Sequence, residues 1–213
     1  MIKNPHPGRF IVFDSLDGSG QSTQAAKLSD FLQEPQQKRL FGHTGIYLTK
    51  EPTPGLIGGL IRGQLSHEWK SGPECLQLLF SADRAHHLEK EIIPLLERGV
   101  TVICDRYLFS TLAYGSLEIK DFPWLLSLQK RFLMPDLTIF LKVSPRICFE
   151  RMIRSRYELT LFEKEDILAK VWGNYEKLAR NFKNKNVYIV DGQGAAEETF
   201  EKIRKIVKKT FLG

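Results

Sequence analysis

A segment rich in glycine and hydroxyl residues has the composition of a phosphate-binding loop. Its glycines allow successive backbone N–H groups to point inward at an anion, and the helical sequence that follows adds the dipole of a helix N-terminus. In such loops the hydroxyl after the lysine position reaches Mg²⁺, and Ser22 has that place here. The expected ATP-binding residues are therefore Ser15, Leu16, Asp17, Gly18, Ser19, Gly20, Gln21, Ser22 and Thr23.

Two positions of this loop depart from the pattern G-x-x-x-x-G-K-[ST]. Ser15 stands where the first glycine belongs, and Gln21 stands where the lysine belongs. A glutamine side chain can still donate hydrogen bonds, but it brings no positive charge to the phosphates. A glycine- and serine-rich turn between a strand and a helix is the alternative interpretation of this segment taken alone.

The elements that would position this loop alternate between strand-like and helix-like runs. The chemistry is expected where strands end, because ligands of open α/β sheets bind at the carboxyl ends. The pattern predicts an α/β P-loop NTPase-type fold, with a parallel five-stranded sheet and helices on both faces, in one domain spanning residues 1–213. Strands are expected at 9–14, 44–49, 100–104, 137–143 and 186–191, and helices at about 22–33, 73–98, 146–155, 162–182 and 195–210, with further helical sequence between 104 and 137. Within the long helical segment, Pro94 is expected to bend or divide the helix, and 34–43 reads as a polar connection.

Composition restricts the class of partner. The net charge of +6 suits phosphates, and no zinc-finger or RNP-type motif supports nucleic-acid binding. No apolar run is long enough for a membrane span, and residues 1–8 lack the apolar region of a secretory signal. The three cysteines have no metal-binding spacing and are expected as buried free thiols in a reducing cytoplasm. The neighbouring histidines His86 and His87 are expected near the surface.

The chain resembles thymidylate kinases in several short segments that occur in the right order. Residues 16–24 match that family's loop L-D-G-S-G-K-S-T-Q except at Gln21, and residues 49–52 resemble its Arg-Glu-Pro motif with Lys50 in place of the arginine. Residues 78–84 resemble the base-binding helix, and 104–107 with 110–114 resemble the D-R-Y motif and the helix after it. The matches run from about residue 9 to residue 191 and cover most of the chain.

This resemblance implies transfer of the ATP γ-phosphoryl to dTMP with Mg²⁺, in a homodimer formed through the long helices. It implies that Phe80 stacks on thymine, that Arg84 donates to O4, and that Arg106 grips the monophosphate. It places Asp17 at the sugar 3′-hydroxyl, Thr111 and Tyr114 beside base and sugar, Lys50 near the acceptor phosphate, and Tyr157 in a lid at about 151–162.

The residue types agree with these roles. Phe80 and Arg84 lie about one helical turn apart and can face the same side, where a ring can stack on a pyrimidine and a guanidinium can donate to its carbonyl. Asp105 ends a buried strand, where a carboxylate is costly unless it meets a cation such as Mg²⁺. Arg106 offers a bidentate fork for a phosphate. Ser22 and Asp105 are thus the expected metal residues.

Three arginines close together could supply the charge that the loop lacks. Arg151, Arg154 and Arg156 lie within six positions, and Arg151 and Arg154 share a helix face. The catalytic residues expected are therefore Asp17, Arg106, Arg151, Arg154 and Arg156. A solvated basic patch is the alternative interpretation of the three.

Three functions remain open at this point. The first is a thymidylate-kinase-like phosphotransferase, and the second is a nucleotide-binding protein that Gln21 has left weak or inactive. The third is a related P-loop kinase with another acceptor, and the pairing of Phe80 and Arg84 with an intact Asp105-Arg106-Tyr107 segment argues against it.

Overall fold

The computed structural model describes residues 1–155 and 164–213, and its centre is a parallel sheet of five strands in the order β3-β4-β2-β6-β7. All neighbouring pairs are parallel, so the predicted fold class is confirmed. The strands are β2 (Phe10–Phe13), β3 (Ile46–Lys50), β4 (Thr101–Asp105), β6 (Leu137–Lys142) and β7 (Val187–Asp191). Their bounds differ from the predicted ones by at most two residues at either end.

The central strand β2 shows why the sheet needs helices on both faces. All four of its residues are buried, and successive side chains point to opposite faces. Phe10 and Val12 enter one hydrophobic core, while Ile11 and Phe13 enter the other. A strand that is apolar on both sides can only lie between two helical layers.

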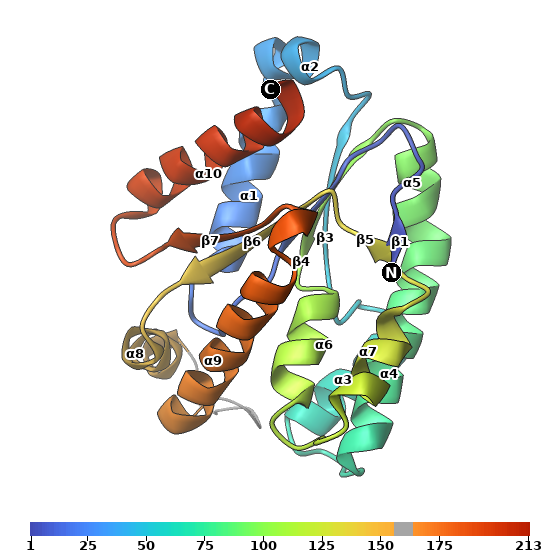
Figure 1. Cartoon of the computed structure of the whole chain (residues 1–213), viewed down its shortest axis with the longest axis vertical. Helices are drawn as coiled ribbons and strands as arrows, with labels where there is room; N and C mark the ends of the chain where they lie inside the picture. Colours follow the sequence, from blue (N-terminus) through green and yellow to red (C-terminus); the bar gives the residue numbers. More distant parts are fainter. Residues whose placement is uncertain (156–163) are drawn as a thin grey trace.

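Two long helices cover one face of the sheet, and a larger group of helices covers the other face (Figure 1). The first layer consists of α1 (Gln21–Gln33) and α10 (Ala196–Leu212), which share a core with β2 and β6. The second layer includes α6 (Leu108–Gly115), α9 (Glu165–Asn181) and the long segment that begins with α4 (Pro73–His87). Helix α8 (Pro145–Ser155) lies at the end of β6.

The long helical segment is divided, as its proline predicts. Helix α4 runs into a π-helical turn at Leu88–Ile92, and α5 (Ile93–Glu97) continues from it with Pro94 in its first turn. Proline lacks the N–H of a regular helix and crowds the preceding turn, so a wider turn immediately before it is the expected local response.

Several elements lie outside the prediction. The connection at 34–43 contains a short helix, α2 (Pro35–Phe41), which begins with proline and ends at the left-handed Gly42. Residues 53–72, which carried no prediction, contain α3 (Leu56–Leu65). Further elements are a 3₁₀ turn (Lys183–Lys185) and a small parallel sheet of β1 (Ile2–Lys3) and β5 (Leu133–Met134). Helix α7 (Phe122–Gln129), in contrast, lies in the stretch between 104 and 137 that was expected to be helical. The expectation of buried cysteines is right for Cys104 and Cys148 and wrong for Cys75, which is exposed. None of the described helices has the length and apolar character that a membrane crossing requires.

Candidate active site

A cavity of about 790 Å³ lies at the carboxyl ends of β2, β3 and β4, where the order of the sheet predicts a ligand site. It brings together most of the expected site residues: Leu16, Asp17, Gly18, Gly20, Gln21, Ser22, Thr23, Lys50, Phe80, Arg84, Asp105, Arg106, Thr111, Tyr114 and Arg151. Ser15, Ser19 and Arg154 are not part of the lining. Arg156 and Tyr157 lie outside the described residues.

The phosphate loop joins β2 to the N-terminus of α1. Gly18 and Gly20 have φ angles of 75° and 89°, which disfavour any residue with a side chain. At Gly18 a Cβ atom would also lie 2.4 Å from the Cys148 carbonyl oxygen. Helix α1 begins at Gln21, so its first N–H groups have no intrahelical partner and lie at the cavity. Backbone groups in this arrangement are able to bind an anion.

Ser15 is accommodated at the first glycine position by the neighbouring strand. The residue is fully buried, and its Oγ donates to the Leu141 carbonyl oxygen at 2.6 Å. Its own carbonyl oxygen accepts a hydrogen bond from Nη1 of Arg106 at 2.9 Å. The serine therefore holds the start of the loop against Leu141 and Arg106, and it does not line the cavity.

Gln21 and Ser22 both contact Asp105. Nε2 of Gln21 donates to Oδ1 of the carboxylate at 2.8 Å, and Oγ of Ser22 donates to Oδ2. Gln21 is buried, and its own amide oxygen has no partner among the described residues. The loop, the start of α1 and the end of β4 thus meet at one carboxylate.

Arg106 is held in an unusual backbone conformation directly after β4. Its φ of 71° is left-handed, which is uncommon for a residue with a long side chain and is typical of functional positions. Its guanidinium donates to Oδ1 of Asp17 at 2.9 Å and to Oγ of Ser110 at 3.1 Å. The fork therefore lies against the phosphate loop and lines the cavity.

Asp17 also receives the phenol of Tyr114. The hydroxyl donates to Oδ2 at 2.8 Å, and the phenol oxygen in turn accepts a hydrogen bond from the Asp17 backbone N–H at 3.2 Å. Burial raises the pKa of the Tyr114 phenol well above its usual range, so the group remains a donor at neutral pH.

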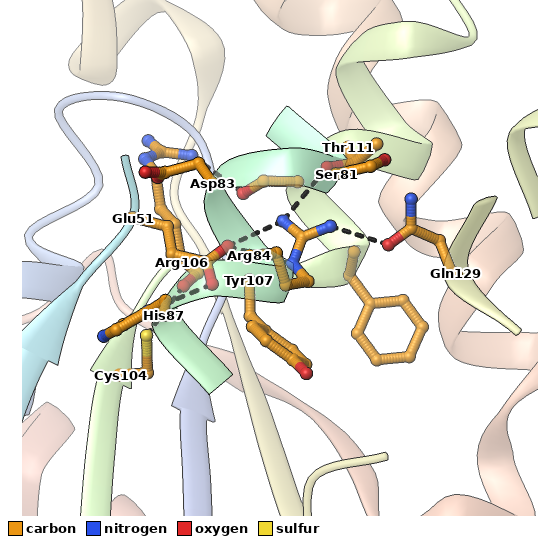
Figure 2. A network of polar contacts seen from close by, with 12 residues as sticks. Glu51, Ser81, Asp83, Arg84, His87, Cys104, Arg106, Tyr107, Thr111 and Gln129 are labelled. Carbon is orange, nitrogen blue, oxygen red and sulfur yellow. Dashed lines mark hydrogen bonds and ion pairs between the residues drawn. The ribbon is translucent and has the colours of Figure 1, made fainter. Parts of the chain in front are cut away.

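At the far end of the cavity, Phe80 is half-buried and Arg84 is only 1% exposed. Figure 2 shows the Arg84 guanidinium at the centre of a polar network. It donates twice to Oε2 of Glu51, at 2.9 and 2.7 Å, and also to Gln129 at 2.6 Å and Thr111 at 3.1 Å. An arginine has five N–H donors, so these four bonds leave one on Nη1.

The expectation that His86 and His87 lie near the surface is right for the first and wrong for the second. His86 is exposed, whereas His87 is buried between two strand-end residues. Its Nδ1 lies 3.2 Å from Oε1 of Glu51, and its Nε2 lies 2.9 Å from Oγ1 of Thr49. The burial follows from the position of His87 on the α4 face that packs against β3.

Sequence reasoning missed the role of Asp14. This carboxylate is fully buried at the end of β2 and accepts hydrogen bonds from the backbone N–H groups of Tyr107, Phe109 and Ser110 and from the Ser110 hydroxyl. It therefore satisfies the first N–H groups of α6. Burial raises its pKa to about 6 against the opposing effect of these donors.

The network around Arg84 also contains two residues whose roles the sequence did not indicate. Glu51 belongs to the Thr-Lys-Glu-Pro segment, but nothing in that segment marks it as the partner of Arg84. Gln129, on α7, is fully buried and has no local pattern around it. Only the fold brings these acceptors to the guanidinium.

The remaining predicted basic residues differ in whether they reach the cavity. Lys50 is exposed at the end of β3, and both Lys50 and Arg151 line the cavity. Nη1 of Arg151 lies 3.4 Å from the carbonyl oxygens of Gly18 and Ser19. Arg154 is exposed on the same helix, α8, away from the lining.

Comparison with known proteins agrees with this geometry. Residues 13–203 match the thymidylate kinase family. The chain is 37% identical to the probable thymidylate kinase of Pyrococcus abyssi over 97% of this chain and 98% of that one. It is 32% identical to the thymidylate kinase of Caldicellulosiruptor saccharolyticus, with coverages of 94% and 96%. A solved structure of the Candida albicans thymidylate kinase superposes with a TM-score of 0.76 at 28% identity, covering 95% of this chain and 92% of that one. The chain belongs to the thymidylate kinase family.

Proposed function

We propose that this protein transfers the γ-phosphoryl group of ATP to dTMP, giving dTDP and ADP. The observation that carries the proposal is the composition of one cavity, which has a backbone anion site at one end and the Phe80–Arg84 pair at the other. A donor triphosphate and an acceptor monophosphate can then meet between the two ends.

Catalysis would consist of positioning and charge neutralisation, without a covalent enzyme intermediate. The start of α1 would hold the donor phosphates through its free N–H groups. Arg106 would grip the acceptor phosphate, and Lys50 and Arg151 would add positive charge from either side. These residues approach the loop from three different elements, so the phosphates would be surrounded by positive charge.

The base and sugar would be read at the other end. Phe80 would stack on the pyrimidine, and the remaining N–H of Arg84 would donate to O4 of thymine. A cytosine presents an amino group there, which would leave the donor unpaired. Asp17 would accept the 3′-hydroxyl, while Thr111 and Tyr114 would line the base and sugar and disfavour a ribose.

Mg²⁺ fits the residues beside the loop. Ser22 and Asp105 present a hydroxyl and a carboxylate, which are hard oxygen ligands suited to this ion. No cluster of three acidic, histidine or cysteine side chains for a metal occurs among residues 1–155 and 164–213, so phosphate oxygens and water would complete the shell. The ion would supply charge neutralisation at the transferring phosphate.

The second candidate, a nucleotide-binding protein without turnover, depends on Gln21 alone. The membership of the chain in the family favours the enzyme. The presence of Asp105, Arg106 and the anion site around the glutamine also favours the enzyme.

A coupled assay of ADP release with ATP, Mg²⁺ and a panel of deoxynucleoside monophosphates tests the proposal. We expect dTMP to be the best acceptor and dCMP, dAMP and dGMP to be poor ones. ADP release with none of them, while dTMP and ATP still bind by calorimetry, would establish the non-catalytic function. A purine preference would contradict the assignment of the base site.

We also propose a cytoplasmic homodimer of this single-domain chain, formed through the long helices. Large apolar side chains on α3 and α4 are exposed, among them Leu56 at 92% and Leu78 at 50%. Such a group of exposed leucines is typical of an association surface. Light scattering coupled to size-exclusion chromatography should give twice the chain mass, and a monomer at micromolar concentration would contradict it.

A further inference from the structure

Gln77 is a polar side chain at the cavity, and the proposed reaction gives it no role. It lies on α4, three residues before Phe80 and seven before Arg84, so the three share one helix face. Gln77 is 2% exposed and lines the cavity. A buried amide without a partner is costly, and such a group facing a ligand cavity indicates a contact that the ligand completes.

The two ends of this amide are not equivalent. Its Oε1 is buried without a hydrogen-bond partner. The atom is pressed against α6, since a Cβ atom at Gly115 would lie 3.1 Å from both Oε1 and Cδ. In the part of the chain that the structure describes, Nε2 also has no hydrogen-bond acceptor. Because Oε1 lies against α6, Nε2 is the atom of the amide that is available to a molecule bound in the cavity.

We propose that Gln77 is a specificity-determining residue whose Nε2 donates a hydrogen bond to the 2-carbonyl oxygen of the bound pyrimidine. This inference rests on the proposed function, because it requires a pyrimidine monophosphate in the cavity. With the ring stacked on Phe80, Arg84 lies one turn toward the C-terminus of α4 and Gln77 lies one turn toward its N-terminus. The 4-carbonyl and 2-carbonyl oxygens lie on opposite sides of N3, so the two donors match the two acceptors.

The two donors then have different tasks. Thymine, uracil and cytosine all carry the 2-carbonyl oxygen, whereas adenine has none. Gln77 therefore selects pyrimidines as a class, and Arg84 distinguishes thymine from cytosine at position 4. Loss of the Gln77 amide should weaken dTMP and dCMP by the same factor and leave their ratio unchanged.

The test combines a variant with an altered ligand. Gln77→Met keeps the length of the side chain and removes the donor, and sulfur at position 2 of dTMP removes a good acceptor. By calorimetry, we expect each single change to weaken binding by about 3- to 10-fold, and the 2-thio analogue to bind Gln77→Met as well as dTMP does. ATP affinity should not change. Gln37→Met is the matched control, since Gln37 is a buried glutamine on α2 with an unpartnered Oε1, away from the cavity.

The outcomes separate this inference from the proposed function. If the unchanged protein does not bind dTMP, the proposed function fails and this inference fails with it. If it binds dTMP but the 2-thio analogue binds as tightly, only the role of Gln77 is wrong, and that measurement needs no variant. If Gln77→Met lowers the ratio of dTMP to dCMP affinity, the residue does not contact the shared carbonyl.

Discussion

Gln21 and Asp105 are joined by a hydrogen bond of 2.8 Å between the glutamine amide and a carboxylate oxygen, which ties the first residue of α1 to the last residue of β4. A lysine in this place would meet the same carboxylate as an ion pair. Glutamine keeps the contact and contributes no charge, so under the proposed function the loop would keep its architecture and would attract the phosphates less strongly.

Replacing Gln21 with lysine should therefore raise turnover. A preorganised donor at a charge-developing oxygen is worth roughly 10²–10³ in rate, so we expect an increase of up to about 10²-fold in kcat. The affinity for dTMP should be unchanged, because the base is bound at the other end of the cavity. Steady-state ADP release and calorimetry measure the two quantities. An unchanged or lower kcat would mean that the site is organised around glutamine.

Arg151 should matter more in the native protein than in the Gln21→Lys variant. Its guanidinium lies against the loop carbonyl oxygens, where it can add charge that Gln21 does not supply. Arg151→Met should then lower kcat by a larger factor in the native background, because the two cations are partly redundant in the variant. Arg154→Met is the control, since Arg154 lies outside the cavity lining. Equal losses from Arg151→Met in both backgrounds would exclude this compensation.

Arg106 should tolerate neither alanine nor lysine. Its left-handed backbone and its bonds to Ser15 and Asp17 fix the fork against the loop. A lysine ammonium carries the charge but cannot reproduce two parallel hydrogen bonds to a phosphate. We expect kcat of Arg106→Lys to lie well below the native value, although above that of Arg106→Ala. Full activity of Arg106→Lys would disprove the bidentate role.

The ion pair of Glu51 and Arg84 should contribute strongly to stability as well as to binding. Both side chains are almost fully buried, at 3% and 1% exposure. Glu51→Gln removes one charge and leaves the other buried without compensation, which should cost about 3–5 kcal/mol of unfolding free energy in urea at pH 7. Glu150→Gln, in the exposed pair with Arg146, should have a far smaller effect, because solvent screens this pair. Equal losses in the two variants would contradict this.

Asp14 should make stability depend on pH in the acidic range. Its pKa of about 6 in the folded protein exceeds the ordinary value of 3.8, so the folded state binds more protons than the unfolded state between these values. The contribution of Asp14 to the unfolding free energy is therefore largest below pH 4, falls as the pH rises toward 6, and is constant above. The decrease amounts to about 3 kcal/mol. Urea unfolding of the native protein and Asp14→Asn from pH 4 to 7.5 should show it as a declining difference, and a pH-independent difference would refute it.

Much of the fold could be predicted because its signals are local. The apolar runs of β2 and β4 and the glycines at 18 and 20 identify two strands and the turn between the first strand and its helix. Parallel topology follows from the alternation of strands with helices. Helix α3 was missed because three of its ten residues are glycines, which lower helix propensity, and α2 was missed because it has only seven residues.

In the candidate site, too, only the residues with local sequence signals could be predicted. Residues within short motifs, such as Asp105 and Arg106, could be found from type and spacing. Asp14 could not be found in this way, because its carboxylate oxygens accept hydrogen bonds from backbone N–H groups 93 to 96 positions away. Gln129 reaches Arg84 across 45 positions and His87 reaches Glu51 across 36, and no periodicity within one element predicts such contacts.

The hydrogen bonds of Asp14 and Ser15 have a consequence for motion. Asp14 fixes the start of α6, which carries Thr111 and Tyr114, and the carbonyl of Ser15 fixes the side chain of Arg106. The donor loop and the wall of the acceptor site are thus fastened to the same strand end and move as one body. Any closure that brings the two nucleotides together must therefore be made by elements outside this body.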